Sequence, residues 1–272
     1  PGLGLIAVWD DGDDVLAEPQ TPGWHAREVA ALRAWHGRAR LLVGGHARTA
    51  ATAQWVADKT ATDLQLSRED ARARRYRVEA QIEPAADQRR IPGRAFALVR
   101  SALAEGVVLV QVPRVGGASG LLCTECGHVA RCPHCGGGVR PDRAGNPRCR
   151  LCHERFEVCQ SCGGREFVAV GAGSRRSAEE LQKAFPGVPV LRSDAESGVL
   201  ETVELEHGLV VATPGAEPPV PGGYAAALIL DTEVLLALSG LRAREQALRR
   251  WLVAIARTSE SATTMLVAPQ DL

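Results

Sequence analysis

The eight cysteines are the residues of this 272-residue chain whose type and spacing point most directly to chemistry. They form four pairs with two residues between the members: Cys123 and Cys126, Cys132 and Cys135, Cys149 and Cys152, and Cys159 and Cys162. Such a pair forms a knuckle that points both sulfurs at one ion, and two knuckles complete a tetrahedral four-sulfur shell. The sequence therefore predicts two metal sites, with zinc as the cofactor (two ions per chain).

Spacing leaves the metal and the pairing of the knuckles open. An iron–sulfur cluster uses the same ligand type, but glycines that follow three of the pairs directly let backbone N–H groups face the thiolates and favour zinc. Nested pairing joins the two inner knuckles across a 13-residue gap that is typical of a zinc ribbon, and leaves the first and fourth knuckles for the second ion. Sequential pairing joins neighbouring knuckles across gaps of five and six residues.

Neither predicted site leaves a coordination position for water, so we expect both to be structural and we predict no catalytic residue. Seven arginines and five acids lie between Cys123 and Glu166. Eight thiolates and two Zn²⁺ change the resulting charge of +2 to −2, which favours only modest DNA affinity and makes contact with proteins equally expected. The candidate phosphate contacts are the arginines between the inner knuckles: Arg140, Arg143, Arg148 and Arg150.

Composition limits the class of protein. The 32 basic and 32 acidic residues balance, and 45% of the chain is hydrophobic, which excludes a disordered chain and a strongly basic polyanion-binding protein. No run of about 18 uncharged apolar residues occurs, so no membrane partner is expected. Clustered cysteines indicate metal binding in a reducing compartment, which predicts a cytoplasmic protein. Because the first residue is Pro1 rather than Met, we expect a fragment of a longer chain.

Hydrophobic patterns predict an α/β fold with parallel sheets, in two regions separated by a charged segment. The apolar run 3–9 predicts a buried strand that ends at Trp9, and the segment 67–90 is charged and aperiodic. We interpret that segment as a connector, with a phosphate-binding basic helix as the alternative. The predicted strands are 3–9, 40–43, 107–112, 167–170, 188–191, 209–212, 225–230 and 263–267, and the predicted helices are 24–35, 47–56, 93–104, 177–185 and 241–255.

The order of these parts resembles the PriA family of replication-restart (primosomal) helicases. Three flanking motifs carry the resemblance: Gly-Gly-Ala-Ser-Gly-Leu-Leu before Cys123, Val-Gly-Ala-Gly at 170–173, and Phe-Pro-Gly-Val-Pro at 185–189. The resemblance implies two RecA-like (P-loop NTPase-type) helicase lobes, the first incomplete, with an inserted zinc module. The implied parts are the end of lobe 1 (1–66), a connector (67–91), the start of lobe 2 (92–122), the double zinc module (123–166) and the rest of lobe 2 (167–272).

The resemblance also implies nested zinc pairing. One ion would take Cys123, Cys126, Cys159 and Cys162, and the other would take Cys132, Cys135, Cys149 and Cys152.

The nucleotide motifs of the family are degenerate in this chain. Where the family reads Asp-Glu-Glu-His, the chain reads Trp9-Asp10-Asp11-Gly12, although a register shift that lets the two aspartates hold a metal stays open. No phosphate loop surrounds either lysine, and the two arginines of the last motif fall on other residue types, with Arg257 displaced by one position. We therefore expect a degenerate nucleotide site at Trp9, Asp10, Asp11 and Arg257, and ATP is doubtful as a cofactor.

The function implied by the resemblance is that of a primosome protein without its own helicase activity. Such a protein recognises stalled or branched forks and helps to assemble the primosome for helicase loading. Its expected partners are branched or single-stranded DNA and the primosome and replication proteins. The alternatives are an active ATP-dependent 3'–5' DNA helicase and a zinc-ribbon adaptor that binds only proteins.

Overall fold

Strands that alternate with helices build both compact units of the chain, Pro1–Ala73 and Arg74–Leu272. The computed structural model describes residues 2–73, 75–83, 90–114, 120–142, 144–169, 173–236 and 241–269. Arg143 and parts of the first two flanking motifs lie outside the described residues. The mixed α/β class is confirmed. Among the described residues, no helix combines the length and apolar character needed to cross a membrane.

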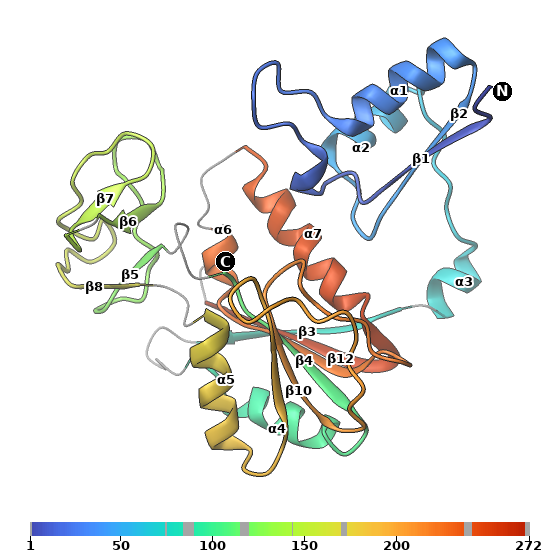
Figure 1. Cartoon of the computed structure of the whole chain (residues 1–272). Coiled ribbons are helices and arrows are strands. Elements are labelled where there is room, and N and C mark those ends of the chain that lie inside the picture. The colour runs from blue at the N-terminus through green and yellow to red at the C-terminus, as the bar shows by residue number, and fades with distance from the viewer. Residues whose placement is uncertain are drawn as a thin grey trace. The chain divides into compact units, whose positions relative to one another are not determined.

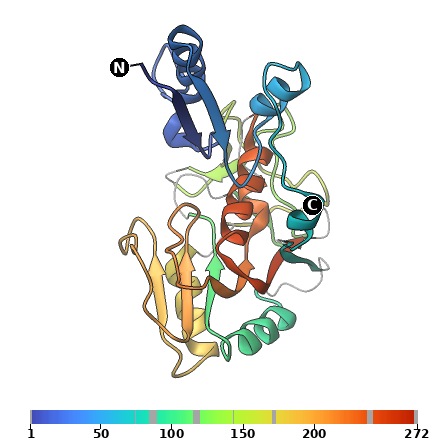
Figure 2. The same ribbon diagram turned by 90° about the vertical axis from the view of Figure 1, so that its right-hand side faces the viewer.

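The first unit contains two parallel strands, β1 (Leu5–Trp9) and β2 (Arg40–Gly44), which run side by side in Figures 1 and 2. Helix α1 (Ala26–Gly37) connects them, as the sequence predicts. The unit also contains a short 3-10 helix, η1 (Asp14–Leu16), and the helices α2 (Ala50–Ala57) and α3 (Arg68–Ala73). The crossover from β1 through α1 to β2 is the usual way to join two parallel strands.

The prediction that the first strand is buried up to Trp9 is wrong. Exposure alternates along β1, and the Trp9 side chain is 67% exposed. The reason is that α1 packs on only one face of the described two-stranded sheet, whereas a parallel strand is buried on both faces only between two helix layers.

The second unit contains a six-stranded sheet in which every pair of neighbours is parallel. The strand order is β3, β12, β11, β4, β10, β9. Continuous apolar runs form its buried centre, as expected for strands with helices on both faces. The strands are β3 (Arg77–Glu83), β4 (Val107–Gln111), β9 (Val190–Ser193), β10 (Gly208–Ala212), β11 (Tyr224–Ile229) and β12 (Thr258–Pro269).

Helices cover both faces of this sheet (Figure 1). On one face, α4 (Gly93–Ala102) and α5 (Gly173–Ala184) enclose an apolar core against β4, β10 and β11. On the other face, α6 (Thr232–Leu236) and α7 (Ala243–Ile255) enclose the second core. Trp251 of α7 is the largest side chain of that second core.

The segment 67–91, which we expected to be a connector, contains α3 and the edge strand β3. Strand β3 pairs with β12 from Arg77 to Glu83. Its residues 77–80 are all exposed, because an edge strand has one neighbour and keeps charged side chains in solvent. Because the segment is charged and lacks hydrophobic periodicity, its sequence did not predict this strand.

Two small antiparallel sheets form the cysteine insert. Strand β5 (Leu121–Cys123) pairs with β8 (Phe167–Ala169), and β6 (Val139–Pro141) pairs with β7 (Pro147–Cys149). We expected residues 167–170 to belong to the second lobe. Strand β8 instead closes the insert, since its pairing with β5 brings the two ends of the insert together.

An ion-pair network lies beyond the carboxyl end of β11. Arg90 donates to Asp231 (3.0 Å) and to Glu180 of α5 (2.8 Å). Glu233, at the start of α6, lies close to this network. Burial, and then repulsion from Asp231, raises the pKa of the Glu233 carboxyl from 4.5 to about 7.

We predict that Glu233→Gln stabilises the protein more at pH 8 than at pH 6. Between the unfolded pKa of 4.5 and the folded pKa of about 7, the folded state holds a proton that the unfolded chain lacks, so the free energy of unfolding of the natural protein falls as pH rises. The variant should gain about 1 kcal/mol relative to the natural protein between these pH values. Thermal unfolding of both proteins at both pH values measures this difference in stability. Glu179→Gln, at an exposed position, controls for the loss of one charge, and equal shifts for the two variants would contradict the prediction.

Candidate metal centres

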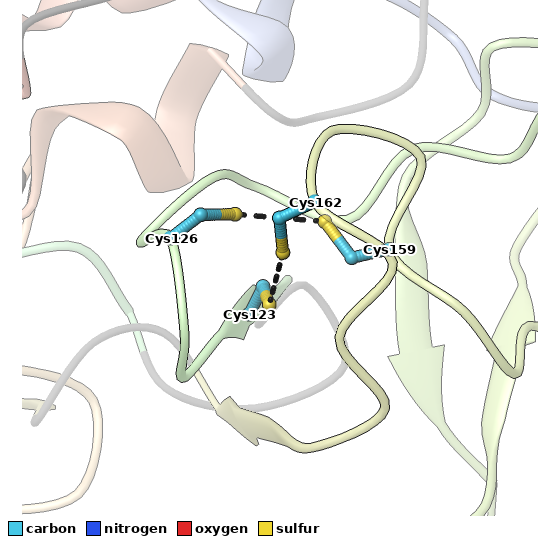
Figure 3. Close-up of side chains that lie close together, drawn as sticks. All are labelled: Cys123, Cys126, Cys159 and Cys162. Atoms are coloured by element: carbon cyan, nitrogen blue, oxygen red, sulfur yellow. Dashed lines mark hydrogen bonds between the residues drawn. The ribbon is translucent and has the colours of Figure 1, made fainter.

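The structure gathers the eight cysteines into two groups of four, and in each group the four sulfurs lie within 4.8 Å of one another. The first group is Cys123, Cys126, Cys159 and Cys162, whose side chains point toward one another in Figure 3. The sulfurs of Cys123 and Cys162 are 3.5 Å apart, and those of Cys126 and Cys159 are 3.6 Å apart.

The second group is Cys132, Cys135, Cys149 and Cys152, with the sulfurs of Cys135 and Cys149 3.4 Å apart. This is the nested arrangement of knuckles. The antiparallel pairings explain it, because β5 and β8 bring the first and fourth knuckles together while β6 and β7 bring the second and third together.

Each knuckle is a tight turn that the local sequence supports. The N–H of Gly127 donates to the carbonyl of Cys123 (2.9 Å), and Gly136 and Gly163 make the same bond in their knuckles. These glycines have φ values of 72°, 68° and 80°, in the left-handed region that glycine adopts most easily. At the knuckle without a following glycine, His153 takes this conformation, with φ 61°.

The donor set fits a divalent metal ion. Four sulfurs at the zinc–sulfur distance of about 2.3 Å from one ion lie about 3.8 Å apart, close to the contacts in both groups. The cysteines of a group share protons unequally. Burial opposes ionisation of Cys149, but the N–H groups of Cys152 and Leu151 outweigh it and lower the pKa of the Cys149 thiol to about 6. The N–H of Glu154 favours the thiolate of Cys152, but burial and hydrogen bonds with neighbouring cysteines outweigh it and raise the pKa of the Cys152 thiol to about 12. With four protein ligands the shell is closed, so the chemistry it offers is structural.

Two of the candidate DNA-contact arginines face each other across the hairpin of the insert. Arg140 on β6 lies opposite Arg148 on β7, and Arg150 follows directly after β7. Arg148 donates from Nε to Asp142 (3.2 Å), so this arginine also holds the hairpin loop. Arg143 lies outside the described residues.

The candidate nucleotide residues are divided between the two units. Trp9, Asp10 and Asp11 lie at the carboxyl end of β1, and the exposed Arg257 lies between α7 and β12. Asp10 has a left-handed backbone, with φ 54°. Among the described residues, the only groups of three or more side chains with metal-binding geometry are the cysteine groups. The alternative in which Asp10 and Asp11 hold a metal together involves two side chains and stays a prediction.

Asp11 is instead held by a residue that the sequence analysis missed. Arg27 of α1 donates from Nη1 to Asp11 Oδ2 (2.7 Å), and Thr49 donates to the same oxygen (2.7 Å). Asp11 and Arg27 are each 2% exposed. Burial tends to lower the pKa of the Arg27 guanidinium, but hydrogen bonds from it to Asp11 and Glu28 outweigh this effect and raise the pKa. Helical spacing could have indicated that Arg27 is buried, because Arg27 lies on the same buried face of α1 as Ala30 and Ala34.

Comparisons with known proteins agree with the order of these parts. The chain is 47% identical to the "Probable replication restart protein PriA" of Mycobacterium leprae, and the match covers 93% of this chain. It is 46% identical to the protein of that name from Mycobacterium tuberculosis, over the same share of the chain. The chain is a PriA homologue. The resemblance expected from the sequence is therefore confirmed.

The match to PriA extends beyond mycobacteria at lower identity. The "Replication restart protein PriA" of Bacillus subtilis is 27% identical over 72% of this chain. The chain spans about two fifths of the length of the mycobacterial PriA proteins, since the match covers 41% of each. No family model matches the chain.

We predict that Asp11→Ala destabilises the first unit by about 3–5 kcal/mol, because it leaves Arg27 as a buried charge without its main partner. Four of the five tryptophans lie in residues 1–73, and the Arg27 guanidinium lies 5.6 Å from the ring of Trp55. Urea unfolding followed by tryptophan fluorescence therefore reports on this unit.

The matched control is Asp63→Ala, which removes the exposed ion pair between Arg48 and Asp63. Exposed pairs contribute about 1 kcal/mol or less, so its effect should be small. Equal losses for the two variants would contradict the importance of the buried pair.

We predict that Cys149→Ser lowers the zinc content of the purified protein from about two ions per chain to about one. The loss of one thiolate opens the inner shell and should disorder the insert around β6 and β7, while the six-stranded sheet remains folded. Elemental analysis gives the metal content, and circular dichroism the fold. Ser161→Ala, which changes a residue between two predicted ligands, should keep both ions. Unchanged zinc content in Cys149→Ser, or global unfolding, would contradict the prediction.

Proposed function

We propose that this chain is the zinc-binding, helicase-like part of a replication-restart protein that recognises stalled or branched DNA forks. In this role it helps to assemble the primosome for helicase loading, in the cytoplasm and without helicase activity of its own. The observation that carries the proposal is the 45–47% identity to mycobacterial proteins named for replication restart, over 93% of the chain. Branched or single-stranded DNA and the primosome and replication proteins are the proposed partners.

The architecture supports a reading of both units as RecA-like lobes. The second unit has a parallel sheet with helices on both faces, and the first has a parallel β–α–β crossover. In a working helicase, carboxylates after a strand of the first lobe hold Mg²⁺ with the nucleotide. The corresponding positions here offer the indole of Trp9, which cannot ligate a cation, the carboxylate of Asp10, and Asp11, whose carboxylate already pairs with Arg27.

The two cysteine groups support two structural zinc ions. A divalent ion bound by four thiolates would supply the folding free energy that the small apolar core of the insert lacks. That core consists of the buried side chains Leu121, Ala130, Val139 and Phe156, with Phe167 packed against them.

We predict that the protein at its full natural length binds a forked DNA more tightly than a blunt duplex and does not hydrolyse ATP. Turnover with forked DNA should stay far below about 1 per second, the lower end of ordinary enzyme rates. Fluorescence anisotropy measures binding, and phosphate release measures hydrolysis.

Each other outcome of this experiment supports a different function. DNA-stimulated hydrolysis that disappears in Asp11→Asn would indicate an active helicase with an unusual nucleotide site. The absence of fork binding, together with capture of replication proteins by the same preparation, would indicate an adaptor that binds only proteins.

A further inference from the structure

The pairing of strands in the inner zinc ribbon aligns three arginines in one row. Arg140 on β6 lies directly opposite Arg148 on β7, and an antiparallel bridge places Arg155 directly opposite Arg148 on its other side. Residues directly opposite each other in an antiparallel sheet project from the same face, with Cα atoms about 5 Å apart. The row therefore crosses three neighbouring segments of the ribbon: β6, β7 and the segment that contains Arg155.

The opposite face of these segments is the interior of the insert. The residues that alternate with the row, Val139, Cys149 and Phe156, are 0%, 2% and 4% exposed. Arg150 follows directly after β7, and its backbone N–H donates to the carbonyl of Gly138 beside β6 (3.0 Å). We call Arg140, Arg148, Arg150 and Arg155 the arginine face.

The arginine face places like charges directly opposite one another. Like charges directly opposite each other in a sheet are destabilising. Asp142 accepts a hydrogen bond from Arg148 (3.2 Å), and the carbonyl of His153 accepts another (3.0 Å), so the central arginine is fixed in place. Among the described residues, no carboxylate lies within 4.0 Å of the guanidinium group of Arg150 or Arg155. An external polyanion would remove the remaining repulsion.

We infer that the arginine face binds the phosphodiester backbone of DNA. This inference rests on the proposed function and deepens it, because it assigns the phosphate contacts to one face of the inner zinc ribbon and adds Arg155 to them. The row spans about 10 Å across three strands spaced by about 4.8 Å. A row of this length can reach neighbouring phosphates of one DNA strand, whose charges are spaced by about 3.4 Å along the helix axis. Guanidinium groups suit these ligands because they donate two parallel hydrogen bonds to phosphate oxygens.

The alignment also explains how an insert of low net charge can bind DNA. The acids Glu125 and Glu166 belong to the region of the outer cysteine group: the carboxylate of Glu125 lies beside Gly164, and the carbonyl of Glu166 accepts from Thr124. The other three acids of the insert, Asp142, Glu154 and Glu157, lie between the second and fourth knuckles, among the arginines. The local positive field of the arginine face therefore depends on the alignment of Arg140, Arg148 and Arg155 and not on a separation of acids from arginines.

The test uses the protein at its full natural length with Arg140, Arg150 and Arg155 all replaced by Gln. Arg148 stays, because it holds the hairpin loop through Asp142. Affinity for a labelled forked DNA is measured by anisotropy over a series of salt concentrations. Each lost phosphate contact lowers the slope of log K against log salt by about 0.9 on duplex and about 0.7 on single strands. We expect the slope to fall by about 2–3 and affinity at low salt to fall at least about tenfold, independent of DNA sequence.

Two matched variants accompany the triple variant. Arg165→Gln removes an exposed arginine of the same insert outside the arginine face and should leave affinity and slope unchanged. Arg155→Gln alone changes one exposed side chain and should lower the slope by about 0.7–0.9. This single variant decides the question if the triple variant loses zinc. Separate single-stranded and duplex probes show which part of the fork the face contacts.

The inference is overturned if the natural protein binds the fork and the zinc-loaded variants bind it with the same affinity and slope. In that case the proposed function survives and the phosphate contacts lie elsewhere. It is also overturned if the variants keep DNA binding but lose an acidic protein partner, since the face would then be a protein interface. Failure of the natural protein itself to bind the fork would instead contradict the proposed function.

Discussion

The second unit depends on the pairing of β4 with two strands that come much later in the chain. Strand β4 ends at Gln111, and its neighbours β10 and β11 begin at Gly208 and Tyr224. All five residues of β4 are buried, so the sheet has no core without this strand. The insert therefore has to bring its two ends close together. The pairing of β5 with β8 does this, since Leu121 lies opposite Ala169. Because a closed insert acts as a short loop, its length adds little to the entropy cost of forming the sheet.

The nested pairing of the insert's strands explains why only part of each metal site could be predicted from the sequence. A knuckle is a local structure, so residue types and a two-residue spacing suffice to predict each pair of ligands. Which knuckles share an ion depends on strand pairing, and the sequence gaps are compatible with both arrangements. The hairpin of β6 and β7 forms inside the pairing of β5 and β8, and the cysteine groups follow that order. The resemblance to PriA indicated this arrangement, whereas spacing alone did not.

Among the regular elements, the predictable ones carry a strong hydrophobic signal and the missed ones do not. The runs at 107–112, 209–212 and 225–230 are continuous apolar segments, and they form the central strands. Strand β3 has its exposed charges at a sheet edge, and α6 has only five residues, too few to show a period. Burial of Trp9 was predicted from its neighbours in sequence, but burial depends on which faces of the sheet are covered. The described part of the first unit covers one.

The partner of Asp11 shows a related limit of prediction from sequence. A buried carboxylate such as that of Asp11 is destabilising unless it is paired. In a nucleotide-binding lobe a metal ion can serve as that partner, whereas here the guanidinium of Arg27, with the hydroxyl of Thr49, satisfies the same oxygen from within the chain. The contact joins residues 16 positions apart through the packing of α1 on β1, so no local pattern reveals it. Since this ion pair and hydrogen bond lie within the chain, they hold the loop after β1 without a bound ligand.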